Sequence, residues 1–316
     1  MIIDCHHHWM PKEHIEELER YLRPNEEVIR ENGKARILRD GTEVFVPNPS
    51  YWDIEAHLAA MDEAGVDMAV LSTSVWQEWN TMEIAPVINN SLAEIQKKYP
   101  ARFIGLAHIP SFEEGAIEEL DRAVRVLGLK GVLIMTNTQG KYPDDDAYRP
   151  LYQKAVELDV PVVVHAAGAL PDHKFLSEYQ LSRVFGRPID HTLVVLRLLL
   201  SGILKDFPAL KFINGHLGGT WFALKERFRS SPFPLQLDDI SLNQLYFDTA
   251  GAKWGKAELT CAAQTLGVDN IVLGSDYPVG RGDQMKWEVE LLKGLGLSEA
   301  DREKIASGNA RKLFKI

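Results

Sequence analysis

Short apolar runs rich in β-branched residues recur along the chain and alternate with amphipathic stretches. The stretches 54–64, 116–127 and 151–158 carry apolar residues at i, i+3 and i+4 spacing, which is typical of helices packed on one face. The apolar runs are predicted to be strands, at 2–5, 68–72, 103–107, 131–135, 161–165, 211–214, 244–248 and 270–274. The alternation predicts parallel strands with helical crossovers. Eight such units in 316 residues favour an α/β fold, the closed (β/α)8 TIM barrel, over an open doubly wound sheet.

Two connections are longer than a crossover helix requires. The first, residues 9–53, contains a possible hairpin at 36–46 with Asp40-Gly41 as its turn. In a barrel this insertion after strand 1 lies at the C-terminal face, where active sites are built, so the hairpin is a candidate lid. The second, residues 166–208, contains an apolar helix near 192–204. A peripheral helix, a subunit contact and a substrate role remain open for it.

Composition narrows the class of protein. The chain is 45% hydrophobic and 25% charged, without repeats or low-complexity segments, so we expect one globular domain spanning residues 1–316. A net charge of −10, a pI near 5.5 and the lack of a basic run argue against a nucleic-acid partner. No signal-peptide pattern or long apolar window indicates a membrane, and we expect a cytoplasmic protein. Cys5 and Cys261 are predicted to be reduced core residues.

Three consecutive histidines follow the first apolar run, in the sequence IIDCHHHW. Side chains two apart on a strand point to the same face, and the residue between them points away. His6 and His8 are therefore predicted to share a ligand that His7 does not reach.

Three later strands also end in polar side chains. Strand five ends PVVVH at His165, strand six leads into GHLGG at His216, and strand eight leads into GSDYP at Asp276. The carboxyl ends of all strands of a parallel barrel lie around one rim, so these side chains converge. Three imidazoles and one carboxylate suit a divalent ion such as Zn²⁺ with an open position; the predicted ligands are His6, His8, His165 and Asp276. His216 is predicted to stay unligated and to move protons.

Each of these residues also has a simpler explanation. Histidine runs occur at exposed termini, His165 could be a buried histidine with a backbone partner, and Asp276 could be a helix N-cap. Agreement across three strands favours the metal site over these separate explanations. We interpret the remaining polar candidates as structural: Asp4, His7, His57, His108, His173 and His191.

The motifs DCHHH, VVVH, INGHLGG and LGSDYP together resemble those of the amidohydrolase superfamily, in the amidohydrolase-2 branch. Within it the chain is most similar to 2-amino-3-carboxymuconate 6-semialdehyde decarboxylase and related metal-dependent decarboxylases. The resemblance spans nearly the whole chain, including YWDIEAHLAAMDEAGVDMAVLST. It implies that His6, His8, His165 and Asp276 bind the metal and that His216 activates water or manages a proton.

The chain departs from this family pattern at substrate-binding positions. Asn48 stands where the decarboxylase has an arginine, and Ala166 and Ala167 stand where it has an aromatic residue after the strand-five histidine. Arg227 matches a second family arginine, which relatives supply across a dimer interface. The resemblance therefore implies a homodimer with Arg227 and Asn48 at the substrate, although a solvated helix arginine also explains Arg227.

A divalent ion lowers the pKa of a bound water to about 7, and a nearby histidine takes its proton. The ion is expected to be Zn²⁺, with Mn²⁺ and Co²⁺ open. With His216 and Asp276 as catalytic residues, the favoured reaction is non-oxidative decarboxylation of a small unsaturated or aromatic carboxylic acid. The alternative is hydrolysis of a lactone, cyclic amide or carbon–carbon bond in a ring-cleavage product. A metal-binding barrel without catalysis is disfavoured, because His216 and the lid would then have no function.

Overall fold

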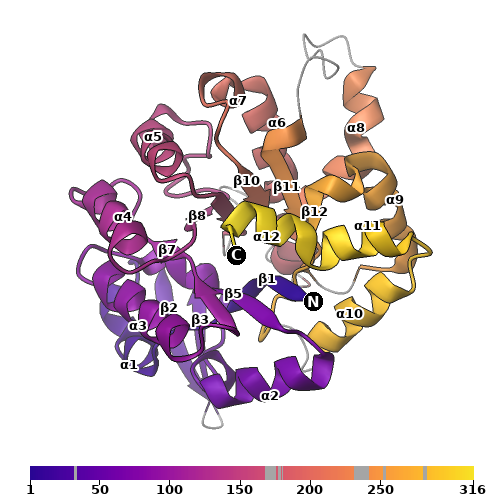
Figure 1. Ribbon diagram of the computed structural model, residues 1–316. Helices are drawn as coiled ribbons and strands as arrows, with labels where there is room; N and C mark the ends of the chain where they lie inside the picture. The colour runs from indigo at the N-terminus through magenta and orange to yellow at the C-terminus, as the bar shows by residue number, and fades with distance from the viewer. Residues whose placement is uncertain are drawn as a thin grey trace.

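Parallel strands occupy the centre of the molecule, and helices lie around them (Figure 1). The structure is a computed structural model that describes residues 1–31, 34–167, 176, 179, 181–230, 242–251, 254–279 and 283–316. The helices of the described chain are α1 (Lys12–Glu16), α2 (Ile54–Ala64), α3 (Ala85–Lys98), α4 (Ala116–Arg125), α5 (Arg149–Leu158), α6 (Arg187–Leu200), α7 (Ile203–Asp206), α8 (Trp221–Arg229), α9 (Lys256–Leu266), α10 (Gln284–Lys293), α11 (Glu299–Glu303) and α12 (Asn309–Phe314).

The central strands form two parallel sheets. One has the order β1-β5-β6, with bounds Ile3–His8, Met68–Ser72 and Phe103–Gly105. The other has the order β12-β11-β10-β9-β8-β7, with bounds Ile271–Val272, Leu245–Asp248, Phe212–Asn214, Val162–His165, Val132–Met135 and Ala107–His108. Each predicted run overlaps an observed strand, and the parallel direction is confirmed. The predicted end of the first strand at Cys5 is wrong, because β1 continues through the three histidines.

The two sheets are neighbours at both of their edges. A single residue, Leu106, separates β6 from β7. At the other edge, the amide of Cys5 donates to the carbonyl of Leu273 at 2.8 Å, and His7 forms a parallel bridge with Tyr277. Backbone bonding therefore continues from β1 to the segment that follows β12.

Strand side chains alternate between two hydrophobic clusters. Ile3, Val70 and Ile213 belong to a cluster between the strands, whereas Leu71 and Phe212 pack in the larger cluster that contains the helices. Burial on both faces explains why the strands read as continuous apolar runs.

The two cysteines are free, as predicted, but only one lies in the core. Cys5 is buried and Cys261 is exposed, so the core prediction for Cys261 is wrong. Helix α9 buries Leu259, Ala262 and Ala263, and Cys261 lies on its other face.

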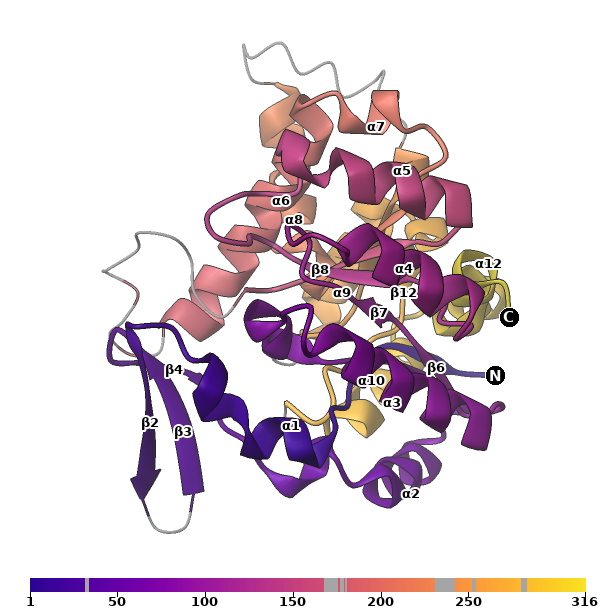
Figure 2. The ribbon, with the colours of Figure 1, turned by 90° about the vertical axis from the view of Figure 1, so that its left-hand side faces the viewer.

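The first long connection forms a small antiparallel sheet beside the central strands (Figure 2). Its order is β2-β3-β4, with bounds Glu26–Glu31, Lys34–Arg39 and Thr42–Phe45. The predicted hairpin is β3-β4, and Asp40 and Gly41 have the positive φ angles, 49° and 75°, that a tight hairpin turn requires. Strand β2 was not predicted, because its charged side chains hide the strand pattern.

The second long connection is dominated by α6, which buries His191, Val194, Val195 and Leu198. A helix so deeply buried is part of the core, so a purely peripheral helix is ruled out. His173, predicted to be structural, lies outside the described residues. Among the helices that the structure describes, none has the length and apolar character needed to cross a membrane.

Candidate metal centre

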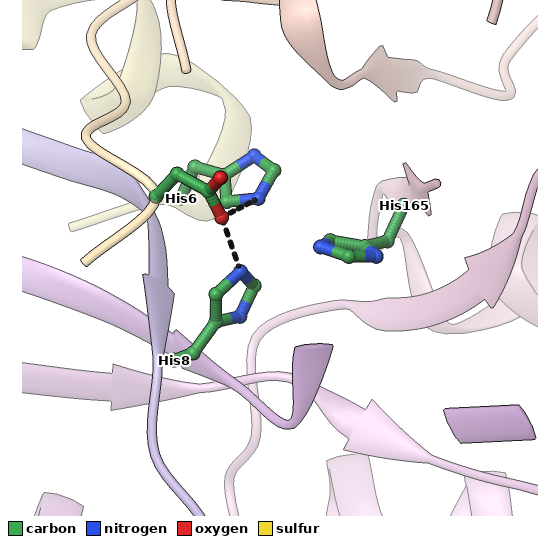
Figure 3. Close-up of side chains that lie close together, drawn as sticks. His6, His8 and His165 are labelled. Carbon is green, nitrogen blue, oxygen red and sulfur yellow. Dashed lines mark hydrogen bonds and ion pairs between the residues drawn. The ribbon is translucent and has the colours of Figure 1, made fainter. Parts of the chain in front are cut away.

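The four predicted metal ligands lie together at the carboxyl ends of the central strands. Their ligand atoms are all within 4.8 Å of one another, and all four residues are buried: His6, His8, His165 and Asp276. Figure 3 shows the three imidazoles turned toward a common point. Oδ1 of Asp276 lies 3.0 Å from Nε2 of His8 and 3.4 Å from Nε2 of His6.

A local irregularity in β1 brings His6 and His8 to this face. Ile3 and Cys5 point into the cluster between the strands, so regular alternation would turn His7 inward. The register with β5 shifts between Asp4 and His7, which reverses the alternation. The pairing of His6 with His8 was predicted, but the bulge that directs them was not.

Gly274 makes room for the first ligand. A Cβ on Gly274 would lie 2.7 Å from Cβ of His6 and 3.2 Å from Cβ of Asp248. The glycine of the LGSD motif therefore allows the strand ends to approach this closely.

Each ligand imidazole is held through its Nδ1 atom. Nδ1 of His6 bonds to Oδ2 of Asp248 at 2.8 Å, and Nδ1 of His8 bonds to Oγ of Ser72 at 2.9 Å. Nδ1 of His165 donates to the carbonyl of Ala166 at 2.8 Å. Such partners fix the ring orientation and leave Nε2 for a metal. Asp248 and Ser72 were not among the predicted site residues, although both stand at the ends of predicted strands.

The surroundings of the Nε2 atoms show whether these residues fit a metal ion. Nε2 of His6 and Nε2 of His165 are buried without a hydrogen-bond partner among the described residues. Buried polar atoms are rarely left unsatisfied, and two of them aimed at one carboxylate suit a shared cation. The donor set therefore fits a divalent metal.

Burial and charge act in opposite directions at this centre. Burial lowers the pKa of His165 well below its usual range and that of His8 to about 4, which keeps both rings neutral, as metal ligands must be. For His6, burial opposes protonation, but Asp248 and Asp276 outweigh it and raise the pKa to about 10. The two buried carboxylates thus favour a positive charge at this point.

His216 lies beside the four ligands on the turn that follows β10. Its Nε2 is 3.8 Å from Oδ2 of Asp276, and its backbone amide donates to Oδ1 of Asp248 at 2.9 Å. Its Nδ1 lies 3.0 Å from Nε2 of His191, a residue predicted to be structural. If His191 donates in this bond, the proton of a neutral His216 ring is on Nε2, which faces Asp276. This arrangement suits a group that transfers protons.

The glycines after His216 serve the packing of the turn. His216 and Leu217 both have φ angles of 54°, a region that side chains rarely adopt. A Cβ on Gly219 would lie 1.8 Å from the carbonyl oxygen of Pro188 on α6, and one on Gly218 would lie 2.7 Å from Phe247. The glycines therefore let the His216 turn contact α6 and β11.

Two adjoining cavities open onto the centre. The hairpin cavity, of about 220 Å³, is lined by residues of β4, by Asn48 and Tyr51, and by the ligands His165 and Asp276. The Trp254 cavity, of about 520 Å³, is lined by His216, Trp254 and Asp276, among others. The proposed proton donor and the ligands thus border space large enough for a small organic acid.

The two predicted substrate-binding residues differ in position. Asn48 lines the hairpin cavity, and its Oδ1 also accepts a hydrogen bond from the amide of Ser50 at 3.0 Å. Arg227 is exposed on α8 and is not among the residues that line either cavity. A role for Arg227 at the substrate would require a second subunit.

His7 points away from the centre into a buried chain of hydrogen bonds. Its Nδ1 is 2.9 Å from Oδ2 of Asp4, and its Nε2 is 2.7 Å from Nδ1 of His57. Nε2 of His57 donates to the carbonyl of Ser50 at 2.6 Å. His108 bonds to Thr73 instead, so these residues tie strand ends to neighbouring loops.

Comparison with known proteins agrees with the resemblance found in the sequence. The chain is 25% identical to 2-amino-3-carboxymuconate-6-semialdehyde decarboxylase of Dictyostelium discoideum, over 88% of this chain and 80% of that protein. It is 29% identical to 2-keto-4-carboxy-3-hexenedioate hydratase of Sphingobium sp., over 99% and 96% of the two chains. The crystal structure of 2,6-dihydroxybenzoate decarboxylase from Rhizobium superposes with a TM-score of 0.80 at 25% identity, covering 99% and 98%.

The family model described as Amidohydrolase matches residues 3–316, which include every candidate ligand and His216. The match and the cluster of His and Asp side chains together support a divalent metal in this protein. The chain belongs to the amidohydrolase family.

Proposed function

We propose that this protein is a metal-dependent non-oxidative decarboxylase of a small unsaturated or aromatic carboxylic acid. The observation that carries the proposal is the buried group of His6, His8, His165 and Asp276 with His216 beside it at the edge of a cavity. The relatives named as decarboxylases support the choice of reaction.

His6, His8, His165 and Asp276 would hold one divalent ion. Three imidazoles and a carboxylate suit Zn²⁺ first, and Mn²⁺ or Co²⁺ also accept this donor set. When bound, the ion would supply Lewis-acid chemistry toward an oxygen atom of the substrate.

His216 is proposed to deliver the proton that decarboxylation requires. The carbon that bears the carboxylate takes this proton, the carbon–carbon bond to the carboxylate breaks, and CO₂ leaves. The electron pair of the broken bond stays with the conjugated system. Oδ2 of Asp276 lies 3.8 Å from Nε2 of His216 and would orient the nitrogen from which the proton leaves.

We propose that the closed barrel, the lid and the oligomeric state of this protein follow those of the family. The bond from Cys5 to Leu273 and the short step from β6 to β7 support closure of the two sheets into one (β/α)8 barrel within a single domain, residues 1–316. The β3-β4 hairpin would act as a lid, since β4 lines the hairpin cavity. We further propose a cytoplasmic homodimer in which Arg227 reaches the substrate of the neighbouring subunit.

Hydration is the second candidate, because the hydratase relative covers 99% of this chain. The test incubates metal-loaded protein with hydroxybenzoates, unsaturated di-acids and lactones, and follows CO₂ release and pH separately. Decarboxylation releases CO₂, lactone hydrolysis releases acid without CO₂, and hydration consumes a double bond without either. Turnover without CO₂ would contradict the proposed decarboxylase.

A further inference from the structure

Two arginines stand four residues apart on one helical segment beside the metal centre. Arg183 lies in the turn Ser182–Gly186, which continues directly into α6, and Arg187 is the first residue of α6. Both line the hairpin cavity together with His165 and Asp276, and both also line the Trp254 cavity. The pair is therefore placed where the two cavities adjoin.

The charges that act on Tyr51 agree with this placement of the two guanidinium groups. Burial raises the pKa of this tyrosine, the Asp276 carboxylate raises it further, and Arg187 and Arg183 lower it. Tyr51 lines the hairpin cavity and lies close enough to Asp276, Arg183 and Arg187 for their charges to shift its pKa.

Arg183 has an acidic neighbour on the hairpin. Nη1 of Arg183 lies 3.4 Å from Oε1 of Glu43 on β4, and Glu43 also lies 3.7 Å from Nη1 of Arg36. Arg183 is thus partly neutralised by the hairpin. Side chains four residues apart on a helical segment are neighbours, so both guanidinium groups can approach one anion in the cavity.

We propose that Arg187, with Arg183 beside it, binds a second carboxylate of the substrate, which makes the substrate a dicarboxylic acid. One carboxylate would lie at the metal centre and the other at the arginines. Arginine is suited to this task because its planar group binds carboxylates through two parallel hydrogen bonds. This inference rests on the proposed function and concerns the substrate class of the same site.

Asn48, Arg183 and Arg187 all line the hairpin cavity. An amide side chain offers hydrogen-bonding groups but no charge. Among these three residues, the positive charge therefore comes from the segment that contains Arg183 and Arg187.

The test compares two unreactive ligands that differ by one carboxylate, benzoate and benzene-1,3-dicarboxylate. Their dissociation constants are measured by calorimetry on metal-loaded protein and on the variants Arg187→Gln and Arg183→Gln. Arg197→Gln is the matched control, because Arg197 is on the same helix and its Nε bonds to Asp144 at 2.6 Å. Metal content is measured on each preparation.

Arg187→Gln should weaken binding of the dicarboxylate by about 10-fold or more, the usual loss for one charge-assisted contact. Benzoate binding should change by about twofold or less, and Arg197→Gln should change neither. Glu43→Gln should tighten dicarboxylate binding, because it frees Arg183 from a competing carboxylate.

Equal losses for both ligands, or no loss for either, in both arginine variants would overturn the inference. CO₂ release from monocarboxylates with such a result would leave the proposed decarboxylase intact. A selective loss of dicarboxylate binding would support the inference even if no panel compound released CO₂, so the two failures are distinguishable.

Discussion

The imidazole of His216 is adjacent to the metal ligands without belonging to their group. His216→Asn should retain the metal, because the other four side chains are unchanged. Its kcat should fall by about 10²–10⁴-fold, the usual value of a general acid. Metal content and kcat are to be measured on one preparation. A metal-depleted variant whose activity returns with excess Zn²⁺ would show that His216 is a ligand instead.

Asp248 orients the first ligand, and its effect should be smaller than that of a ligand itself. Asp248→Asn loses the charge that holds Nδ1 of His6, and metal affinity should fall about 10–100-fold in competition with a chelator. His165→Ala removes a donor atom and should abolish stoichiometric metal. Asp62→Asn, an exposed carboxylate paired with Arg102, is the control. Full metal affinity in Asp248→Asn would refute this role.

The sequence predicted the four clustered residues because each follows an apolar run, a rule that needs only strand order. Asp248 also ends such a run, yet a single polar residue at a strand end is common and gave no sign of a partner. His191 was predicted to be structural because its position on a helix is far, along the sequence, from any strand end. Contacts of this kind depend on side-chain packing, which periodicity does not encode.

At the scale of elements, the approach of β12 to β1 should control the metal centre. Gly274→Ala places a Cβ 2.7 Å from Cβ of His6, so His6 must shift. We expect bound metal to fall and the free energy of unfolding to drop by about 1–3 kcal/mol, as in overpacked cores. Gly294→Ala, whose added Cβ lies no closer than 3.4 Å to its neighbours, is the control. Unchanged metal affinity in Gly274→Ala would contradict this dependence.

The hairpin shows where prediction of elements succeeded and where it stopped. The Asp-Gly turn and the flanking alternation indicated β3-β4, but Ile37, Val44 and Phe45 are buried in the main core. Deleting residues 36–46 would therefore harm folding as well as turnover, which makes deletion a poor test of a lid. Tertiary packing of this kind is invisible in a local pattern.

At the scale of the whole molecule, the order of strands followed from alternation alone, because crossover connections of one hand place successive strands side by side. The positions of the buried charged groups did not follow from the sequence pattern. The chain carries a net charge of −10, and the region behind the metal centre includes the buried carboxyl groups of Asp4, Asp248 and Glu288. Neighbouring buried carboxylates repel one another, which favours the protonated form of the one that lacks a positive partner.

Glu288 on α10 is the carboxyl group of these three with a raised pKa. Burial raises the pKa of Glu288 to about 9, and nearby Asp4 and Asp248 contribute to the rise. Nε2 of Gln284 donates to its Oε1 at 2.9 Å, a bond that favours the ionised form and offsets part of this rise. In the unfolded chain the same carboxyl titrates near 4.5. Between these values the folded state binds a proton that the unfolded state does not, so stability must fall as pH rises.

Glu288→Gln should remove this pH dependence, because the amide has the same shape and does not titrate. Urea unfolding of the wild-type protein should lose up to about 1.4 kcal/mol per pH unit between about pH 6 and pH 9, and the variant should lose less. Glu290→Gln, on the same helix but exposed and paired with Lys293, should keep the wild-type slope. Parallel pH profiles for wild type and Glu288→Gln would mean that Glu288 is ionised in the folded protein. The charge behind the metal centre would then be balanced by a cation rather than by a proton.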